Sequence, residues 1–238
     1  MINKIIVFDG VPSDRFGMYV GSTASDNAPE RDIETVVVPG RNGTLTIDNG
    51  RFNNIEIPYT CFIRRGYVDN IAAARAFFCS RVGYKLLEDT THPDEFRMAR
   101  YVSGMEVTPS QMRKQGYFTL TFDAMPQRFL KSGERVAEYT TDGEIYNGTM
   151  FAAMPLLRVY GVGTFGIGSE TITILSNPFA YIDIDCETMD AYNGATNCNS
   201  YIRLDSGDFP VLAANGTTGI ELQTGITKIG ITPRWYTI

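Results

Sequence analysis

Three acidic side chains, Asp183, Asp185 and Glu187, alternate with apolar residues and share one face of a predicted strand. Paired carboxylates can act as acid and nucleophile in glycoside hydrolysis, or can bind calcium. Two carboxylates two residues apart on one strand point the same way, whereas a glycosidase needs them on either side of the scissile bond. We therefore expect these residues to form the solvated face of a half-buried strand.

The single histidine, His92, lies in a turn predicted at residues 90–94. A catalytic triad needs a histidine beside a nucleophile and an acid, and a zinc site needs several His or Cys ligands at close spacing. The sequence offers neither pattern. We therefore expect an exposed turn histidine, no catalytic residue and no metal, and we do not expect an enzyme.

Gly161, Gly163 and Gly166 match the G-x-G-x-x-G pattern of dinucleotide-binding loops. In those loops the pyrophosphate binds at the N-terminus of a following helix. Here the next segment, Ser169–Leu175, is β-branched and alternating, which predicts a strand. We expect a hairpin turn and no cofactor.

Several tyrosines could stack on sugar rings or could equally belong to the core and rim of a β-sandwich. They are Tyr139, Tyr146, Tyr192 and Tyr201. A carbohydrate-binding β-sandwich module in host recognition is therefore an alternative function. The chain has a single tryptophan, Trp235, which is few for a surface on which sugar rings would stack.

The charge is uneven along the chain: residues 1–135 carry a net charge of +1 and residues 136–238 a net charge of −7. An acidic second half argues against nucleic-acid binding there, because phosphate contacts need Lys and Arg. Together with polar, turn-rich residues at 130–147, this step predicts two domains, 1–135 and 136–238. The apolar runs are too short to cross a bilayer, so we expect no membrane anchor and no export signal. The four cysteines lack a C-x-x-C pair, which favours free thiols.

Most of the chain is predicted as strand and turn. Residues 51–64 and 116–124 alternate between apolar and polar, and the Asn42-Gly43 step predicts a hairpin joining Glu34–Pro39 to Thr44–Ile47. Residues 9–33 are predicted as a long loop with one short strand at most, at Arg15–Val20, and Ser22–Asn27 would be a mobile or partner-ordered arm. Six further short strands in the second half predict a β-sandwich.

One helix is predicted, at Asp69–Val82, with Asp69 as its N-cap and Gly83 after its end. Its apolar stripe would consist of Ile71, Ala74, Phe78 and Val82. The helix would cover one face of a sheet. Arg75 lies close to the stripe, either as a snorkelling side chain or as one half of an ion pair at a subunit contact.

With these elements in place, the chain resembles the distal tail proteins of siphophages over essentially its whole length. Short motifs carry this resemblance through their order and spacing. They are Val38–Leu45, Gly116–Phe122 leading to Pro126, Ile182–Glu187, Gly207–Leu212 and Pro233–Tyr236.

The resemblance implies a mainly β fold in which an N-terminal β-sandwich with one α-helix forms a hexameric ring and a galectin-like β-sandwich projects outward. The implied role is a structural hub at the distal end of a long non-contractile tail. The implied partners are other copies of the chain, the major tail tube protein, the tail-tip hub protein and receptor-binding or baseplate proteins. The implied location is the tip of the virion tail, after synthesis in the cytoplasm of the bacterial host. Genome DNA would pass through the lumen without specific binding.

A ring of identical copies needs an element that reaches a neighbour. We expect the polar arm, the hairpin turn or both to do this. The candidate contact residues are Ser22, Asn27, Gly40, Arg41, Asn42 and Arg75.

Overall fold

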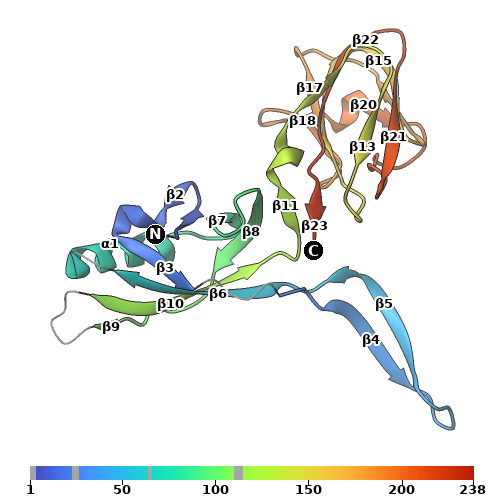
Figure 1. The fold of residues 1–238 in the computed structure, drawn as a ribbon. Coiled ribbons are helices and arrows are strands. Elements are labelled where there is room, and N and C mark those ends of the chain that lie inside the picture. The colour runs from blue at the N-terminus through green and yellow to red at the C-terminus, as the bar shows by residue number, and fades with distance from the viewer. Residues whose placement is uncertain (1–3, 23–26, 64–65, 110–114) are drawn as a thin grey trace. The chain divides into compact units, whose positions relative to one another are not determined.

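The computed structural model describes residues 4–22, 27–63, 66–109 and 115–238. The chain divides into two compact units, residues 1–128 with Ile238 and residues 129–237 (Figure 1). Strands dominate both units, and α1 (Tyr67–Cys79) is the one α-helix among the described residues. The predicted mainly β fold with one helix is confirmed.

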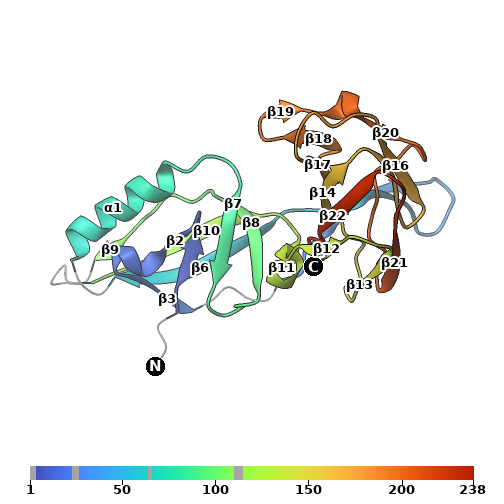
Figure 2. The same ribbon diagram turned by 90° about the horizontal axis from the view of Figure 1, so that it is seen from above.

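The first unit is built on an antiparallel sheet in the order β2-β1-β7-β8-β10-β6-β3, with β9 beside β10. Its strands are β1 (Ile6–Phe8), β2 (Val11–Pro12), β3 (Met18–Ser22), β6 (Ile55–Ile63), β7 (Lys85–Asp89), β8 (Glu95–Tyr101), β9 (Thr108–Pro109) and β10 (Gly116–Ala124). The helix α1 lies against this sheet (Figure 2). A separate two-stranded ribbon, β4 (Arg31–Val37) with β5 (Thr44–Phe52), completes the unit.

The centre of this sheet follows directly from the alternating sequence. Strands β6 and β10 pair over their full lengths, from Ile55 opposite Ala124 to Ile63 opposite Gly116. Every second side chain of each strand is buried, which puts the apolar set on one face. That face packs on the helix through Ile71, Ala74 and Phe78.

The predicted bounds of the helix are wrong at both ends. Gly66 adopts a φ of 60°, outside the helical region, and the helix begins directly after it, which leaves Asp69 in the first turn and not at the N-cap. The helix ends before Ser80, whose hydroxyl donates to the carbonyl of Phe77. Val82 therefore lies beyond the helix and is 86% exposed, so it does not belong to the apolar stripe.

Residues 9–33 are not the long loop that the sequence predicts. They contain β2, a 3-10 turn (Ser13–Phe16), β3 and the start of β4. Ser13 ties the segment together, because its hydroxyl accepts from the backbone of Ile6 and donates to the carbonyl of Met18. Phe16, Met18 and Val20 alternate into the core, where the sequence allowed one short strand, but the two-residue β2 and the 3-10 turn break the alternation before them.

The second unit is a β-sandwich of two antiparallel sheets. One sheet has the order β12-β22-β14-β17-β18-β19 and the other β13-β21-β15-β16-β20. The strands are β12 (Ala137–Tyr139), β13 (Gly143–Asn147), β14 (Leu156–Gly161), β15 (Gly163–Ile167), β16 (Glu170–Ile174), β17 (Ile182–Asp185), β18 (Asp190–Asn193), β19 (Thr196–Asn197), β20 (Ile202–Leu204), β21 (Gly216–Leu222) and β22 (Ile226–Thr232). Before and after the sandwich, β11 (Arg128–Leu130) pairs with β23 (Tyr236–Thr237).

The G-x-G-x-x-G segment lies within this sandwich, where β14 leads into β15. Gly161 and Gly163 both have positive φ, and a Cβ on Gly161 would lie 2.2 Å from the carbonyl oxygen of Gly225. Close approach of two backbones explains these glycines. The following residues form strand β16, as predicted, although β15 occupies much of the segment predicted as a turn.

Phe78 should carry much of the stability of the first unit. Its ring centroid lies 5.9 Å from that of Phe8, 6.1 Å from Phe122 and 5.5 Å from Tyr101. Phe78→Ala is expected to lower the free energy of unfolding by about 3–5 kcal/mol, because it leaves a cavity under the helix. Urea unfolding followed by far-UV circular dichroism measures this loss. The matched control, Val82→Ala, should change stability by less than about 0.5 kcal/mol; equal losses would contradict the assigned helix end.

Candidate functional site

The ribbon β4–β5 is the most exposed element of the first unit. It pairs with no other strand among the described residues. Figure 1 draws β4 and β5 side by side. From Arg31 to Arg51, every residue except Asp32 is exposed. An isolated two-stranded ribbon is marginally stable in water at best. The described part of its own unit does not supply the packing that it needs.

Apolar side chains lie on this ribbon without cover. They are Ile33, Val36, Val37, Val38, Leu45 and Ile47. The register sets Val36 opposite Leu45 and Glu34 opposite Ile47, so Val36, Leu45 and Ile47 share one face. A cluster of exposed apolar side chains on unpaired strands is typical of a protein-protein contact.

Polar contacts shape the ribbon without burying it. Arg31 Nε lies 2.6 Å from Asp48 Oδ2, and Arg51 Nε lies 2.6 Å from Asp32 Oδ2. The hydrogen bond from Arg51 lowers the pKa of Asp32, as the backbone N–H of Gly50 and then Arg31 lower that of Asp48. Exposed ion pairs of this kind add little stability.

The turn at the tip contains three of the predicted contact residues, Gly40, Arg41 and Asn42, and all three are exposed. Gly40 has a φ of 80°, and the backbone N–H of Arg41 donates to the carbonyl of Val38 at 3.2 Å. The turn therefore sets where the two strands reverse and leaves its side chains open to a partner.

The other predicted contact residues lie in different elements. Ser22 ends β3, and Asn27 donates its side-chain N–H to the carbonyl of Glu56; residues 23–26 of the proposed arm lie outside the described residues. Arg75 is exposed on α1 and donates to the carbonyl of Met105 at 3.4 Å. The sequence missed the apolar ribbon positions, although the run Val36–Val38 beside alternating β5 was a usable signal.

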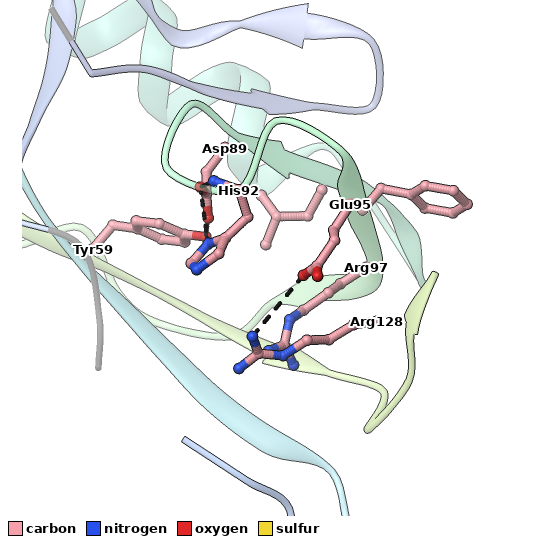
Figure 3. A pocket seen from close by; sticks show the side chains of 8 residues that line it. Tyr59, Asp89, His92, Glu95, Arg97 and Arg128 are labelled. Carbon is pink, nitrogen blue, oxygen red and sulfur yellow. Dashed lines mark hydrogen bonds and ion pairs between the residues drawn. The ribbon is translucent and has the colours of Figure 1, made fainter. Parts of the chain in front are cut away.

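A small hollow in the first unit gathers polar side chains from three parts of the chain. It has a volume of about 20 Å³ (Figure 3). Its polar lining consists of Tyr59, Asp89, His92, Glu95, Arg97 and Arg128. Sequence reasoning reached only His92, because residues 59, 97 and 128 meet only when the sheet forms.

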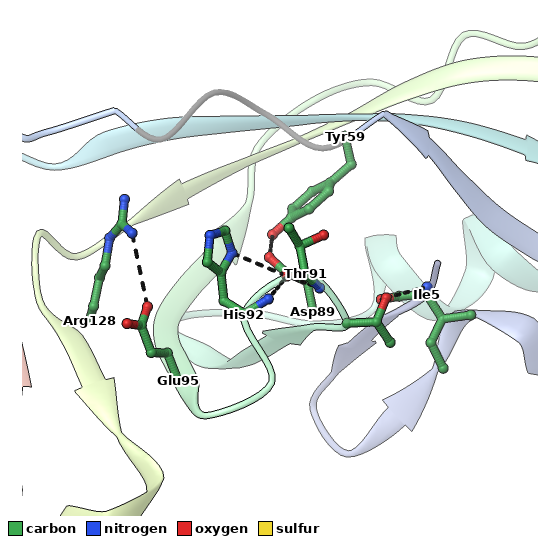
Figure 4. A network of polar contacts seen from close by, with 8 residues as sticks. Ile5, Tyr59, Asp89, Thr91, His92, Glu95 and Arg128 are labelled. Atoms are coloured by element: carbon green, nitrogen blue, oxygen red, sulfur yellow. Dashed lines mark hydrogen bonds and ion pairs between the residues drawn. The ribbon is translucent and has the colours of Figure 1, made fainter. Parts of the chain in front are cut away.

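Asp89 is the hydrogen-bond acceptor around which the side chains of this hollow are arranged (Figure 4). It accepts hydrogen bonds from the Tyr59 hydroxyl at 2.9 Å and from the backbone N–H groups of Thr91 and His92 at 2.8 Å each. Burial alone would raise the pKa of Asp89, but these hydrogen bonds outweigh it and lower the pKa. Burial and the adjacent carboxylate raise the pKa of Tyr59.

His92 is only partly exposed, whereas the sequence predicts an exposed turn histidine. Its side chain is 34% exposed, and its Nδ1 lies 3.3 Å from Asp89 Oδ1. The tight turn closed by Asp89 holds the ring against the hollow.

Asp89→Asn should lower the free energy of unfolding by about 1–3 kcal/mol at pH 7, because it removes an ionised acceptor of three hydrogen bonds. A depressed pKa contributes stability above the unfolded value, here 3.8, and loses it as the pH falls through the folded value. The gap between wild type and variant should therefore close below about pH 4. Thermal unfolding at a series of pH values checks this. The exposed Asp94→Asn serves as control, and a gap that stays constant down to pH 2 would refute it.

The expectation of a solvated acidic face is wrong for Asp183 and Asp185, whereas Glu187 is exposed. Asp183 and Asp185 are 5% and 7% exposed. Arg158 Nε and Nη2 bind the two oxygens of Asp183 at 2.7 and 2.8 Å. Arg234 Nη1 and Nη2 bind those of Asp185 at 2.7 and 2.8 Å, and Arg234 also reaches Glu187 at 3.4 Å.

These ion pairs between arginine and aspartate determine which reactions the two aspartates could take part in. Burial would raise the pKa of Asp185, but Arg234 outweighs it and lowers the pKa. Each aspartate has both oxygens bound by one guanidinium, so neither is placed to protonate a glycosidic oxygen or to attack a sugar. The carboxylates hold the side chains of Arg158 and Arg234 against β17.

The tyrosines proposed for sugar stacking do not form one platform. Tyr139 and Tyr192 belong to one sheet and Tyr146 to the other, and Tyr139 and Tyr201 pack on the core. Only Tyr146 is largely exposed, at 62%.

The described residues contain no cluster of three or more His, Cys, Asp or Glu able to hold a metal ion. Among them, no helix is long and apolar enough to cross a membrane. The four cysteines have free thiols, with Cys79 exposed and the other three buried.

No protein-family profile matches the chain, and none of the curated proteins does. Solved structures do match it along its length. The crystal structure of the SPP1 Dit protein, described as a hub of the adsorption apparatus of phages that infect Gram-positive bacteria, superposes with a TM-score of 0.74 at 10% identity and covers 99% of both chains.

Two structures of the phage P2 baseplate in its activated conformation match as well. The form with Ca has a TM-score of 0.53 at 10% identity, covering 97% of this chain and 98% of the other. The form with Sr has a TM-score of 0.52 at 10% identity, covering 96% and 97%. The chain therefore has the fold of these phage hub and baseplate proteins, as its sequence motifs predicted.

Proposed function

We propose that the chain is a structural hub protein at the distal end of a long non-contractile phage tail and has no catalytic activity. The observation that carries this proposal is the match to the SPP1 Dit protein over 99% of both chains, which includes both units. A shared fold alone does not fix function. The exposed apolar side chains of the β4–β5 ribbon are a second argument, because a protein partner could bury them.

We further propose that copies of the chain form a hexameric ring, and that the ribbon makes the contact between neighbours. In a ring, each copy presents one surface to the next copy and receives a different surface from the previous one. A projecting ribbon with Val36, Leu45 and Ile47 on one face suits the presenting role. Gly40, Arg41 and Asn42 at its tip would reach furthest.

The remaining partners follow from the proposed position. The ring would join the major tail tube protein on one side and the tail-tip hub protein on the other, and the second unit would carry receptor-binding or baseplate proteins. The chain would be made in the host cytoplasm and end at the tail tip of the virion, with DNA passing through the lumen without specific binding.

The triple variant Val36→Ser, Leu45→Ser, Ile47→Ser tests the ring. Wild type is expected to form hexamers, detected by native mass spectrometry and sedimentation velocity. The variant should remain monomeric at the same concentration, because its ribbon no longer gains from burial. Its far-UV circular dichroism should match wild type, since these positions lie outside the core.

The matched control changes exposed valines away from the ribbon, Val68→Ser and Val82→Ser, which are 64% and 86% exposed. It should still form hexamers. A triple variant that assembles like wild type would remove the ribbon from the interface. A wild-type chain that stays monomeric at every concentration would remove the self-assembling ring.

A further inference from the structure

The tip of the β4–β5 ribbon carries an Asn42-Gly43 step, and such a step has a chemistry of its own. The backbone nitrogen of the glycine can attack the side-chain carbonyl carbon of the asparagine and close a five-membered ring. Attack within one chain is fast when the two groups can meet, and glycine has no Cβ to obstruct it. The described residues include five Asn-Gly steps, which begin at residues 42, 49, 147, 193 and 215.

The Asn42 side chain is open to solvent. It is exposed and makes no hydrogen bond to a described residue. Gly43 has a φ of 83°, and a Cβ built on it would meet no described atom within 4 Å beyond its two neighbours in the chain. The hydrogen bond that closes the turn runs from the Arg41 N–H to the Val38 carbonyl and uses neither reacting group. The Asn42 amide therefore has space in which to approach the Gly43 nitrogen.

The Asn49-Gly50 step lies on the same ribbon and is also exposed, but both of its reacting groups are occupied. The Asn49 side chain donates from Nδ2 to Asp32 Oδ1 at 3.2 Å. The Gly50 N–H donates to Asp48 Oδ1 at 2.8 Å. Ring closure here has to break two hydrogen bonds to carboxylates first. The two steps share residue types and exposure, and they differ in the contacts that hold them.

The three steps of the second unit are held as well. Asn147 and Asn193 each donate a side-chain N–H to a backbone carbonyl, at 2.9 and 3.0 Å, and Asn147 is fully buried. Asn215 is exposed, but it accepts from the Tyr146 hydroxyl at 3.4 Å, and the glycine after it begins β21, which is paired with β13. Among the described Asn-Gly steps, only the one at the ribbon tip has a side chain without a hydrogen bond.

We propose that Asn42 is a site of spontaneous deamidation in the chain before it assembles. The Gly43 nitrogen loses its proton to hydroxide and forms a bond to Asn42 Cγ, while the Cγ–Nδ2 bond breaks and the amide nitrogen takes up a proton and leaves as ammonia. Water then adds to either carbonyl of the succinimide ring and opens it to aspartate or isoaspartate. Solvent is the only co-reactant, and nothing is oxidised or reduced.

The products change the element that we propose reaches the neighbouring copy. Either product places a carboxylate beside Arg41 where a neutral amide stood, and isoaspartate also adds one methylene group to the main chain. A contact between copies would cover Asn42 and hold it, so the reaction should belong to the unassembled chain. This restriction rests on the proposed ring, whereas the reaction itself does not.

The first arm of the test incubates the full chain at pH 8 and 37 °C, at a concentration where it is monomeric. Trypsin cleaves after Arg41 and Arg51 and releases one peptide, residues 42–51, that contains both Asn42 and Asn49. Tandem mass spectrometry assigns the mass increase from –NH₂ to –OH to either residue. Asn42 should react about tenfold or more faster than Asn49, because Asn49 must first lose two hydrogen bonds to charged acceptors.

Two controls separate the effect of structure from that of sequence. In concentrated urea the difference between the two residues should fall below about threefold, because nothing then holds Asn49. Asn42→Gln should leave residue 42 unmodified in the folded chain, because its longer side chain would have to close a six-membered ring, and Asn49 should keep its rate. Equal rates at the two residues in the folded wild type, or no reaction at Asn42, would overturn the proposal.

The second arm repeats the incubation on hexamers isolated by size-exclusion chromatography. Deamidation of Asn42 should slow about tenfold or more in the hexamer, and that of Asn49 should serve as the reference within the same peptide. An undiminished rate in the hexamer would overturn the restriction to unassembled chains and remove the tip from the interface, with the site of deamidation intact. A wild type that never assembles would overturn the ring, and the first arm would still decide the site.

Discussion

The ribbon β4–β5 is a single layer with apolar side chains that it cannot cover itself. In a sandwich, each apolar face is covered by the opposite layer, and both units achieve this elsewhere: Phe122 and Phe165 are fully buried. The ribbon has no opposite layer among the described residues. This constraint separates the parts of the chain that have a hydrophobic core from a ribbon whose apolar side chains are exposed.

Arginine is used in two contrasting ways in the two units. In the second unit, Arg158 and Arg234 each bind both oxygens of a poorly accessible aspartate, so the charges are paired on the face of β17 opposite the core. In the first unit, Arg97 lies near Arg128, Glu95 and Asp89, and its Nη1 is buried without a hydrogen-bond acceptor among the described residues.

The regular parts of the fold could be predicted because the pattern is local. The alternation in β6 and β10 and the helical stripe through Ile71, Ala74 and Phe78 are visible within a short window. Val82 was misassigned because apolar character continues past the point where the backbone leaves the helix. Most of residues 9–33 was missed because β2 has only two residues and a 3-10 turn interrupts the alternation that continues in Met18 and Val20.

The candidate sites were harder to predict because they depend on distant partners. Asp183 and Asp185 read as a solvated face, since nothing near them in sequence shows that arginines 25 and 49 residues away neutralise them. The tip of the ribbon was identified from its Asn-Gly step. The apolar ribbon positions were missed because an apolar strand face does not show whether another layer of the same chain covers it. Arg97 and Arg128 lie far apart in the chain, and only the folded sheet brings them together.

The pair between Arg234 and Asp185 bears on how such a sequence can diverge. Arg234 adopts a φ of 57°, which a side-chain-bearing residue rarely tolerates, and it is held there by a nearly inaccessible carboxylate. Replacing one partner alone leaves the other without its counter-charge, which destabilises the protein. A substitution at one position should therefore be tolerated only when the other position changes too. Homologues should therefore keep both residues or replace both, so the two positions should covary even where overall sequence identity is low.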